Sequence, residues 1–506
     1  MSGPGMSGWR RGRGGWGVRI EFDLSNVNDY QTFLKVKALP RYKIVGRSAI
    51  VPDEYAERLG LIPSRSIGMG YEPIPGLFDY QQGISALAIR KRKFAIFMRC
   101  GLGKSLCSLE FARHAQRDLG EARRVLIITP LLVGDQLMGE ARRFYGDALP
   151  LVRVAASELP RWVESTGPEI GVTNYEALTD KVKRGRLGCL IPDESSTMKS
   201  AYGKWGQRLI ELGKGLNWKL ALTGTPAPND RIEFGNHAVF LDAFPTVNSF
   251  LAKFFVNRGQ TDNRWEMKPH ALRPFYRALS DWSIFVDNPA TYGWKDNVGS
   301  IPPIITHIHD VDLTADQQAR IRAATGSFVV GGNLGGIVGR SKVARIAKGG
   351  DSLKPAFIRD LIGSWPDEST IVWCKYNDEQ DQLARVLPDA VSIQGSTKYE
   401  RRVAMLADFQ AGRVKTLISK PEVLGFGLNL QVATRHVFST LHDSWEDFHQ
   451  AVSRSNRVGS TRPLNVHIPL TEAERPMVET VLRKAKRIEH DLAEQEAIFR
   501  DERIAA

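Results

Sequence analysis

The stretch that most constrains the fold runs from Phe94 to Ala112, FAIFMRCGLGKSLCSLEFA. An apolar segment of strand character leads into the glycine-rich turn Gly101-Leu102-Gly103-Lys104-Ser105, and a helical pattern follows. A strand, a glycine turn and a helix in this order are the context that a phosphate-binding loop requires. Glycines let backbone N–H groups surround an anion, and the helix N-terminus adds the positive end of its dipole. In such a loop Lys104 reaches the β- and γ-phosphates of a nucleotide, and the hydroxyl of Ser105 binds Mg²⁺.

One residue departs from the full pattern G-x-x-x-x-G-K-[ST], which has glycine at the position of Met98. The alternative is therefore a glycine-rich turn followed by an incidental Lys-Ser pair. The position of the turn, after a strand and before a helix, favours nucleotide binding.

Polar clusters follow the strand-like segments that come next. ARRVLIITP, EIGVTNYEAL, GCLIPDESS and WKLALTGTP end in Thr129-Pro130, Thr173-Asn174-Tyr175, Asp193-Glu194 and Thr223-Gly224-Thr225-Pro226. In an open parallel α/β sheet, ligands bind at the carboxyl ends of the strands. The sequence therefore predicts an α/β domain with these clusters along one edge of its sheet.

The pair Asp193-Glu194 has the chemistry that a phosphate-loop enzyme needs. Asp193 is expected to hold Mg²⁺ together with Ser105, because Mg²⁺ takes few protein ligands and keeps several waters. Glu194 is expected to orient and deprotonate an attacking water. Such a dipeptide is common by itself, and its position after the loop and before TGTP makes it informative.

A second α/β set begins at Leu353 and carries candidate arginines. Gln450, Arg454 and Arg457 are spaced i, i+4 and i+7 in a helix predicted over 445–457, so they are expected on one face. Guanidinium groups placed there stabilise charge in phosphoryl transfer. The alternative is a surface face with salt bridges.

The chain divides into six predicted segments. They are a disordered Gly/Arg tail (1–17), a small accessory domain (18–71), a first α/β domain (72–247), a helical insertion and connector (248–352), a second α/β domain (353–471) and a charged C-terminal helix (472–506). The tail is either inert or in weak contact with phosphates. The last helix carries a basic patch, Arg483-Lys484 and Lys486-Arg487, which is either a solvated face or a DNA contact.

Composition limits the class of protein. The formal net charge of +13 indicates a polyanionic partner, although a basic surface alone is common. Four widely spaced cysteines argue against a zinc site or a disulfide framework and fit a reducing compartment. Apolar runs long enough to cross a membrane are lacking, so we expect a soluble protein of the cytoplasm.

Taken together, these motifs resemble those of superfamily 2 helicase-type ATPases (DEAD/DEAH-box-like), most closely the Swi/Snf-like DNA translocases. The resemblance covers about residues 72–470 in the family's order, from Tyr80-Gln81 through CGLGKS, VLIITPLLVGDQLMGE, VTNYE, DESSTMKS, LTGTPAPND, IVWCKY and GFGLNLQVA to QAVSRSNRVGS. The chain departs from the family's pattern at three places. These are Met98-Arg99-Cys100 before the loop, Ser195-Ser196 where Gly-His is usual, and Val423-Leu424 directly before GFGLNLQVA.

The resemblance implies two tandem RecA-like domains of the P-loop NTPase class, with ATP and Mg²⁺ between them. Gln81 would read the adenine, residues 101–105 would bind the phosphates, and Gly427 and Asn429 would line the cleft. Catalysis would use Lys104, Asp193, Glu194, Gln450, Arg454 and Arg457. Nucleic acid, most simply double-stranded or forked DNA, would contact Thr129, Pro130, Thr173, Asn174, Lys375 and Ser419. We further expect a monomer that works in DNA repair or recombination. Because the length is close to that of a bare motor of this family with one small N-terminal module, we expect it in the cytoplasm of a bacterium or a phage-infected host.

Two other functions stay open from the sequence: a strand-separating DNA or RNA helicase, and an ATP-gated DNA clamp with little hydrolysis. Residues 18–67 weakly resemble the small N-terminal domains of HARP-type annealing helicases and phage fork-remodelling enzymes. A packing domain that covers a sheet edge is the alternative for these residues.

Overall fold

The computed structural model describes residues 9–11, 18–23, 25–37, 39, 42–51, 70–200, 203–228, 230–259, 265–296, 301–325, 343, 345–347, 352–424, 428–441 and 445–504. Sequence patterns also predict a helix over 52–59 and a Gly-rich loop over 326–336. Both of these segments, and Gly427, lie outside the described residues.

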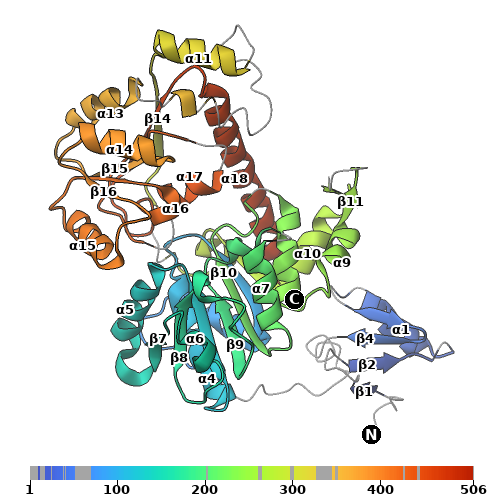
Figure 1. Cartoon of the computed structure of the whole chain (residues 1–506). Helices are drawn as coiled ribbons and strands as arrows, with labels where there is room; N and C mark the ends of the chain where they lie inside the picture. The colour runs from blue at the N-terminus through green and yellow to red at the C-terminus, as the bar shows by residue number, and fades with distance from the viewer. Residues whose placement is uncertain are drawn as a thin grey trace.

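A small antiparallel sheet forms the N-terminal module (Figure 1). Its strand order is β1 (Trp9–Arg11), β2 (Val18–Glu21), β4 (Ser48–Val51) and β3 (Lys43–Val45), with helix α1 (Val27–Lys37) packed on β4. Val18, Ile20, Val36, Ala49 and Val51 make a core of its own. Residues 9–11 were expected in the disordered tail, but they pair with β2 through backbone hydrogen bonds that require no side-chain pattern. Helix α1 was not predicted, because its apolar residues follow no clean helical period.

The first α/β domain has a seven-stranded parallel sheet in the order β13-β5-β10-β9-β6-β8-β7. The strands are β5 (Lys93–Met98), β6 (Arg124–Thr129), β7 (Leu151–Arg153), β8 (Ile170–Asn174), β9 (Leu187–Pro192), β10 (Trp218–Thr223) and β13 (Ser283–Val286). Nearly every residue of β6, β9 and β10 is buried, as expected for strands covered on both faces.

Two hydrophobic clusters cover the two faces of this sheet. One face packs against α3 (Asp79–Lys91), α4 (Lys104–Leu119) and α5 (Val133–Tyr145). The other packs against α6 (Leu159–Trp162), α7 (Lys204–Gly213), α8 (Phe234–Phe240), α9 (Val247–Phe254) and α10 (Leu272–Trp282). Short 3-10 turns connect them: η1 (Gly146–Ala148), η2 (Tyr175–Ala177), η3 (Ser195–Met198), η4 (Arg231–Glu233) and η5 (Pro289–Tyr292).

The segment expected as a helical insertion also contains strands. A hairpin, β11 (Phe255–Asn257) and β12 (Trp265–Met267), follows α9, and β13 joins the first sheet beside β5. The four residues of β13 are all buried, and so short an apolar run cannot be distinguished from a buried helix by periodicity.

The second α/β domain has a six-stranded parallel sheet in the order β14-β19-β18-β15-β17-β16 (Figure 1). The strands are β14 (Ile304–Asp310), β15 (Thr370–Trp373), β16 (Val391–Ile393), β17 (Thr416–Ser419), β18 (Arg435–Phe438) and β19 (Leu464–Leu470). The helices are α11 (Ala315–Thr325), α13 (Lys354–Gly363), α14 (Asn377–Val386), α15 (Tyr399–Gln410), α16 (Pro421–Leu424) and α17 (Trp445–Val452). Strand β14, from the predicted connector, is an edge strand of this sheet.

The C-terminal helix α18 (Arg475–Ile504) runs back from the second domain to the first (Figure 1). Its Phe499 is fully buried, with its ring centroid 5.0 Å from that of Phe285 on β13. Gln495 donates from Nε2 to the hydroxyl of Tyr276 on α10 at 3.0 Å. The predicted charged helix is therefore present, and it links the two domains.

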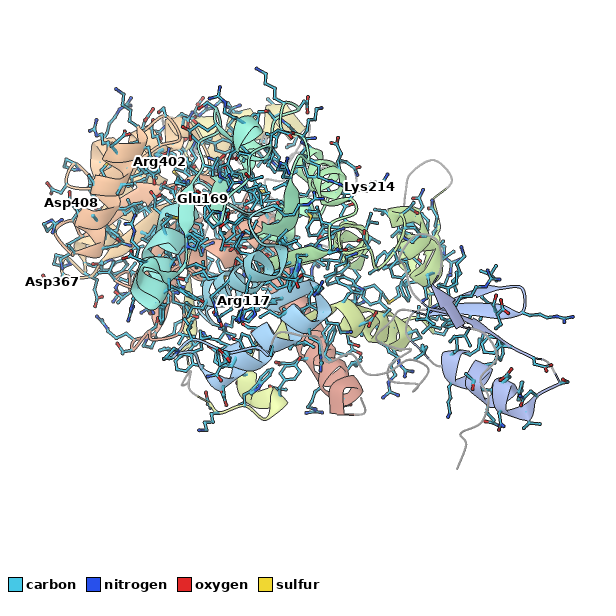
Figure 2. The ribbon with its side chains drawn as sticks, turned by 90° about the horizontal axis from the view of Figure 1, so that it is seen from below. Arg117, Glu169, Lys214, Asp367, Arg402 and Asp408 are labelled. Carbon is cyan, nitrogen blue, oxygen red and sulfur yellow. The ribbon has the colours of Figure 1, made fainter. Side chains whose placement is uncertain are left out.

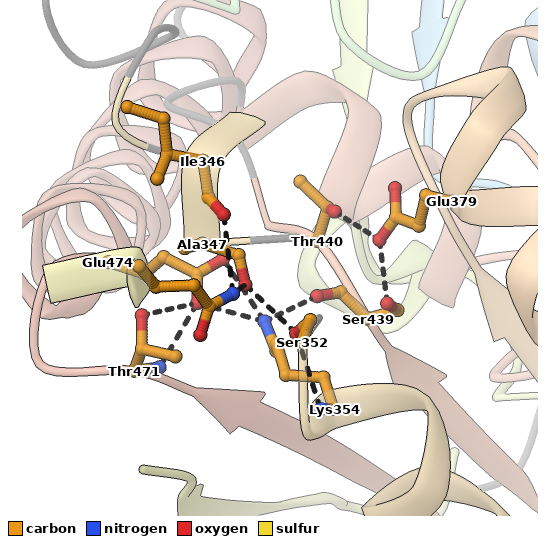
Figure 3. A network of polar contacts seen from close by, with 10 residues as sticks. Ile346, Ala347, Ser352, Lys354, Glu379, Ser439, Thr440, Thr471 and Glu474 are labelled. Atoms are coloured by element: carbon orange, nitrogen blue, oxygen red, sulfur yellow. Dashed lines mark hydrogen bonds and ion pairs between the residues drawn. The ribbon is translucent and has the colours of Figure 1, made fainter. Parts of the chain in front are cut away.

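A buried ion pair anchors the start of α18 (Figure 3). Lys354 on α13 donates from Nζ to both carboxylate oxygens of Glu474, at 3.0 and 2.9 Å, and to the carbonyl of Ser439 at 2.7 Å. Glu474 also accepts from the backbone N–H of Thr471 at 3.0 Å. The network joins α13, the end of β18 and the beginning of α18.

Charged side chains such as Arg117, Lys214 and Asp367 project from the outside of both α/β domains (Figure 2). Over the part of the chain that the structure describes, no helix is both long and apolar enough to span a bilayer.

Candidate active site

The glycine turn lies between β5 and α4, as the sequence predicts. Gly101 has φ of 91° and Gly103 has φ of 84°, values that favour glycine because a side chain would be strained there. Leu102 is 1 % exposed, and its carbonyl accepts from Tyr80 Oη and Gln81 Nε2, both at 3.0 Å. Helix α3 therefore holds the shape of the loop.

Met98, where the loop pattern has glycine, is the last residue of β5 and pairs with Val286 of β13. Its side chain is fully buried in the core between the sheet and α3–α5. Because the residue is in extended conformation and points into a core, glycine has no conformational advantage at this position. The departure from the pattern leaves the loop itself unchanged.

Lys104 and Ser105 open helix α4 at the turn. The Lys104 ammonium donates to the carbonyls of Met98 at 2.7 Å and Arg99 at 3.4 Å. Both residues are partly exposed, at the N-terminus of a helix whose backbone N–H groups favour anions. Gln81 accepts from the N–H of Phe78 at 3.1 Å in addition to its bond with Leu102, so here it supports the loop. Its role in reading adenine stays a prediction.

The acidic pair lies at the end of β9, two strands from β5 in the sheet. Asp193 is 8 % exposed and Glu194 is 7 % exposed. Burial, followed by the charge of Glu194, raises the pKa of Asp193 to about 7. Glu194 has φ of 54°, a left-handed conformation that costs a non-glycine residue about 1–2 kcal/mol. The charge of Lys104 acts on Asp193, so the acidic pair faces the start of α4, where Ser105 lies, and carboxylate and hydroxyl oxygens are donors that fit Mg²⁺.

Three residues that were not among the predicted catalytic or binding residues hold the acidic pair in place. Tyr175 donates from its hydroxyl to the carbonyl of Asp193 at 2.5 Å. Thr223, at the end of β10, lies 3.5 Å from Glu194 Oε2 through its hydroxyl. His237 on α8 bonds through Nε2 to the hydroxyl of Ser195 at 3.0 Å. Burial lowers the pKa of His237 to about 4, so the imidazole is neutral at pH 7. His237 gave no sequence signal, because it lies in helix α8, after the end of the motif LTGTPAPND and outside its pattern.

The arginines reach the cleft from a turn, and the expectation of one helical face is wrong. Helix α17 ends at Val452, so Gln450 lies on the helix while Arg454 and Arg457 follow it. The segment after α17 is tied to a part of the chain 25 residues earlier, because the hydroxyl of Ser455 donates to the carbonyl of Leu430 at 2.8 Å.

The turn after α17 packs against the phosphate loop. A Cβ added to Gly101 would lie 3.1 Å from both Arg457 Cβ and the backbone nitrogen of Val458. Arg454 is 2 % exposed, and burial, with Arg454 as a neighbouring positive charge, lowers the pKa of Arg457. Arg457 beside the phosphate loop is partly buried, and together with the buried Arg454 it is suited to bind a polyanion.

Asn429 is linked to this turn by hydrogen bonds through Gln431. Its side-chain oxygen accepts from Gln431 N at 3.1 Å, and Gln431 donates from Nε2 to the carbonyl of Val458 at 2.8 Å. Leu430 N donates to the carbonyl of Arg454 at 3.0 Å. Asn429 thus lies near the arginines, and its contact with a nucleotide stays a prediction.

Half of the predicted nucleic-acid residues are buried side chains. Thr129 and Ser419 are fully buried, and Thr173 is 1 % exposed. Their hydroxyls donate to backbone carbonyls of Pro130, Ile393 and Val154. The structure does not support side-chain contacts from these three, because a hydroxyl at the end of a buried strand is needed to satisfy the backbone.

The other three are partly exposed at the same strand ends. Pro130 follows β6, and Asn174 caps the turn after β8 by accepting from Ala177 N at 2.9 Å. Lys375, after β15, pairs with Glu422 and lies 3.7 Å from Asp447. These residues remain candidates for contact with phosphates.

The chain is similar in part to known helicases. A family model described as the helicase conserved C-terminal domain matches residues 353–459. Protein p41 of Acyrthosiphon pisum secondary endosymbiont phage 1 is 22% identical over 76% of this chain and 88% of its own length. A Caenorhabditis elegans homolog of the SWI/SNF-related matrix-associated actin-dependent regulator of chromatin subfamily A-like protein 1 is 22% identical over 86% of this chain and 64% of its own.

The DNA annealing helicase and endonuclease ZRANB3 of Bos taurus is 22% identical over 64% of this chain and 34% of its own length. The chain thus spans less than two thirds of the length of both animal relatives. Among solved structures, the Sulfolobus solfataricus SWI2/SNF2 ATPase core in complex with dsDNA aligns over 80% of this chain and 90% of its own, at 20% identity and a TM-score of 0.41.

Proposed function

We propose that this chain, a Swi/Snf-like member of helicase superfamily 2, is an ATP-dependent translocase that moves along DNA. The observation that carries the proposal is the contact of Arg457 and Val458 with Gly101 of the phosphate loop. This contact brings anion-binding groups of both α/β domains to one place. A nucleotide bound there favours the closed arrangement of the domains, and its hydrolysis releases that preference.

Each residue of the site has a defined part in hydrolysis. Lys104 and the loop N–H groups bind the phosphates, and Glu194 orients the attacking water and accepts its proton. Ser105 and Asp193 would hold Mg²⁺, which supplies positive charge at the phosphate oxygens. Arg454 and Arg457 stabilise the charge of the transferred phosphoryl group, an effect of about 10³–10⁵ in rate. Thr223 lies against the Glu194 carboxylate and keeps it in position.

Double-stranded or forked DNA is the proposed track. The net charge of +13 favours a polyanion, and Pro130, Asn174 and Lys375 lie at carboxyl ends of the two sheets. Binding that neutralises DNA phosphates weakens by about 0.9 log units per phosphate contact for each tenfold rise in salt. We therefore expect DNA affinity to fall steeply between low and moderate salt.

The test is steady-state ATP hydrolysis with no nucleic acid, duplex DNA, single-stranded DNA, forked DNA and RNA. We expect duplex or forked DNA to stimulate turnover most. Lys104→Ala should lose nucleotide binding, whereas Glu194→Gln and Arg457→Ala should bind ATP and lose turnover. The matched control is Arg462→Ala, because Arg462 is 62% exposed and paired with Glu368 outside the cleft. Stimulation by RNA alone, or full turnover by Arg457→Ala, would contradict the proposal.

A further inference from the structure

A cavity of about 350 Å³ lies between the two α/β domains on the opposite side of β5 from helices α3 and α4. Its floor is formed by Phe97 of β5 and Phe285 of β13, and the segment after β10, residues 224–228, closes one side. Hairpin β11–β12 and helices α17 and α18 form the remaining walls. Its size is at the lower end of the range for small-molecule sites. Neither Lys104 nor the acidic pair lines it.

Aromatic side chains from separate elements face this cavity. Trp265 and Phe255 belong to the hairpin, and Trp445 belongs to α17. The Trp445 ring is stacked on His449, one turn further along α17, with centroids 4.7 Å apart and planes at 26°. Aromatic faces attract cations through their quadrupoles, and they also pack well against flat apolar groups.

The charged groups of the lining are mostly acidic, in a chain that is basic overall. Four carboxyl side chains, Asp230, Glu266, Asp287 and Glu496, and two guanidinium groups, Arg99 and Arg231, line the cavity, and Arg258, which is not among the lining residues, lies 3.6 Å from Glu266. Arg99 lies 3.7 Å from Asp287. Burial raises the pKa of Glu496, whose Oε1 accepts from the N–H groups of Asp287 and Asn288. The lining therefore offers more acceptors than donors.

One acceptor in the lining is buried and has no partner among the described residues. Gln495 is 6 % exposed, and its Nε2 is bonded to Tyr276 while its Oε1 accepts from nothing in the described chain. His449 Nδ1 likewise has no partner there, and burial lowers the pKa of His449 to about 4, so the ring is neutral. A buried amide oxygen without a donor is costly, and a ligand N–H would remove that cost.

We propose that this cavity is a binding site for an organic cation, an amidinium, guanidinium or primary ammonium group carried on a small apolar or aromatic body. The aromatic walls take the apolar body, and the acidic rim with Gln495 Oε1 takes the N–H donors. The ligand would contact residues of both domains. The second domain contributes helix α17, which is followed by the turn that carries Arg454 and Arg457. Occupancy therefore favours the domain arrangement seen here and slows the opening and closing that turnover needs.

Benzamidine and benzamide make a matched pair of probes, because they have the same shape and only benzamidine is cationic. We expect isothermal titration calorimetry on the full chain to show saturable, one-to-one binding of benzamidine, at least tenfold tighter than benzamide. Glu266→Gln should weaken benzamidine binding at least threefold, because it removes one rim carboxylate. Glu400→Gln, on the exposed surface of α15 away from the cavity, should leave it unchanged.

Trp265→Leu provides a second variant if Glu266→Gln alters folding, and it should weaken both probes. Equal binding of the two probes, or benzamidine binding that neither variant changes, would overturn the proposal. Benzamidine binding that does not saturate and has no defined stoichiometry would be adventitious, and this result would also overturn the proposal.

A second readout depends on the proposed function. With DNA-stimulated turnover, saturating benzamidine should lower kcat at least twofold and change the KM for ATP less than twofold, because the cavity lies outside the nucleotide site. Binding without any ATP turnover in the unliganded protein would refute the proposed function and leave the cation site standing. Turnover with no effect of bound benzamidine would refute the coupling between the cavity and the domain movement.

Discussion

The buried pair of Lys354 and Glu474 allows a quantitative prediction about the link between the second domain and α18 (Figure 3). Lys354 is 2 % exposed and Glu474 is 4 % exposed, so solvent does not screen the pair. Glu474→Gln keeps the shape and removes the charge that compensates the Lys354 ammonium. Breaking one partner of a buried pair typically costs about 3–5 kcal/mol in the free energy of unfolding.

In a domain of about 150–250 residues, each kcal/mol lowers Tm by about 2–4 °C, so the expected shift is about 6–20 °C. Differential scanning calorimetry measures the shift. Hydrogen exchange followed by mass spectrometry locates it, and peptides from β18 and the start of α18 should lose protection first. The exposed pair Arg413–Asp408 provides the control, because Asp408→Asn should cost less than about 1 kcal/mol.

A double variant separates the charge from the packing. Lys354→Met with Glu474→Leu replaces both charges by apolar groups of similar size and should cost less than Glu474→Gln alone. If Glu474→Gln shifts Tm no more than Asp408→Asn does, the pair contributes nothing beyond a surface salt bridge and the reasoning is wrong.

Three further predictions concern the site and the N-terminal module. The raised pKa of Asp193 means that the folded protein binds this proton more tightly than the unfolded chain, so the free energy of unfolding should fall as pH rises from about 4 to about 7, and Asp193→Asn should flatten that slope in urea titrations across this range. Gly101→Ala should keep the fold, as judged by circular dichroism, and lose at least tenfold in ATP turnover, because φ of 91° and the close turn at Arg457 leave no place for a methyl group; near-normal turnover would show that the contact is dispensable. Deletion of residues 1–67 should leave duplex-stimulated hydrolysis, because the module has its own core, and it should remove the preference for forked DNA. A soluble truncation that still prefers forks in a hydrolysis assay would exclude the module as the part that recognises the fork, and an insoluble truncation would favour the packing role.

The first sheet and its loop were predictable because each feature has a local cause. The run before Gly101 is a buried strand, and Gly101 and Gly103 adopt the positive φ that the loop requires. The acidic pair and the TGTP cluster lie at strand ends, where a parallel sheet collects its ligands. Two parallel α/β domains followed from the alternation of strand and helix patterns.

Features that depend on contacts distant in sequence were not predictable. Helix α17 ends at Val452, and the segment after it is bonded to Leu430 through Arg454 and Ser455, a contact that no periodicity reveals. Strand β13 joins the first sheet almost two hundred residues after β5, and α18 returns to the same domain. The burial of Thr129, Thr173 and Ser419 was not predicted. A threonine or serine hydroxyl at a strand end can bond either to solvent or to a backbone carbonyl, and the sequence does not distinguish the two.

The measurement that tests the central claim most directly is displacement of a third strand from a DNA triplex. A translocase that moves along duplex DNA removes the third strand with ATP and leaves the duplex intact. We expect ATP-dependent displacement by the wild-type chain, and none by Glu194→Gln or Arg457→Ala at concentrations where both bind DNA. DNA-stimulated hydrolysis without displacement would contradict translocation and favour an ATP-gated clamp, and separation of the duplex strands would instead favour a strand-separating helicase.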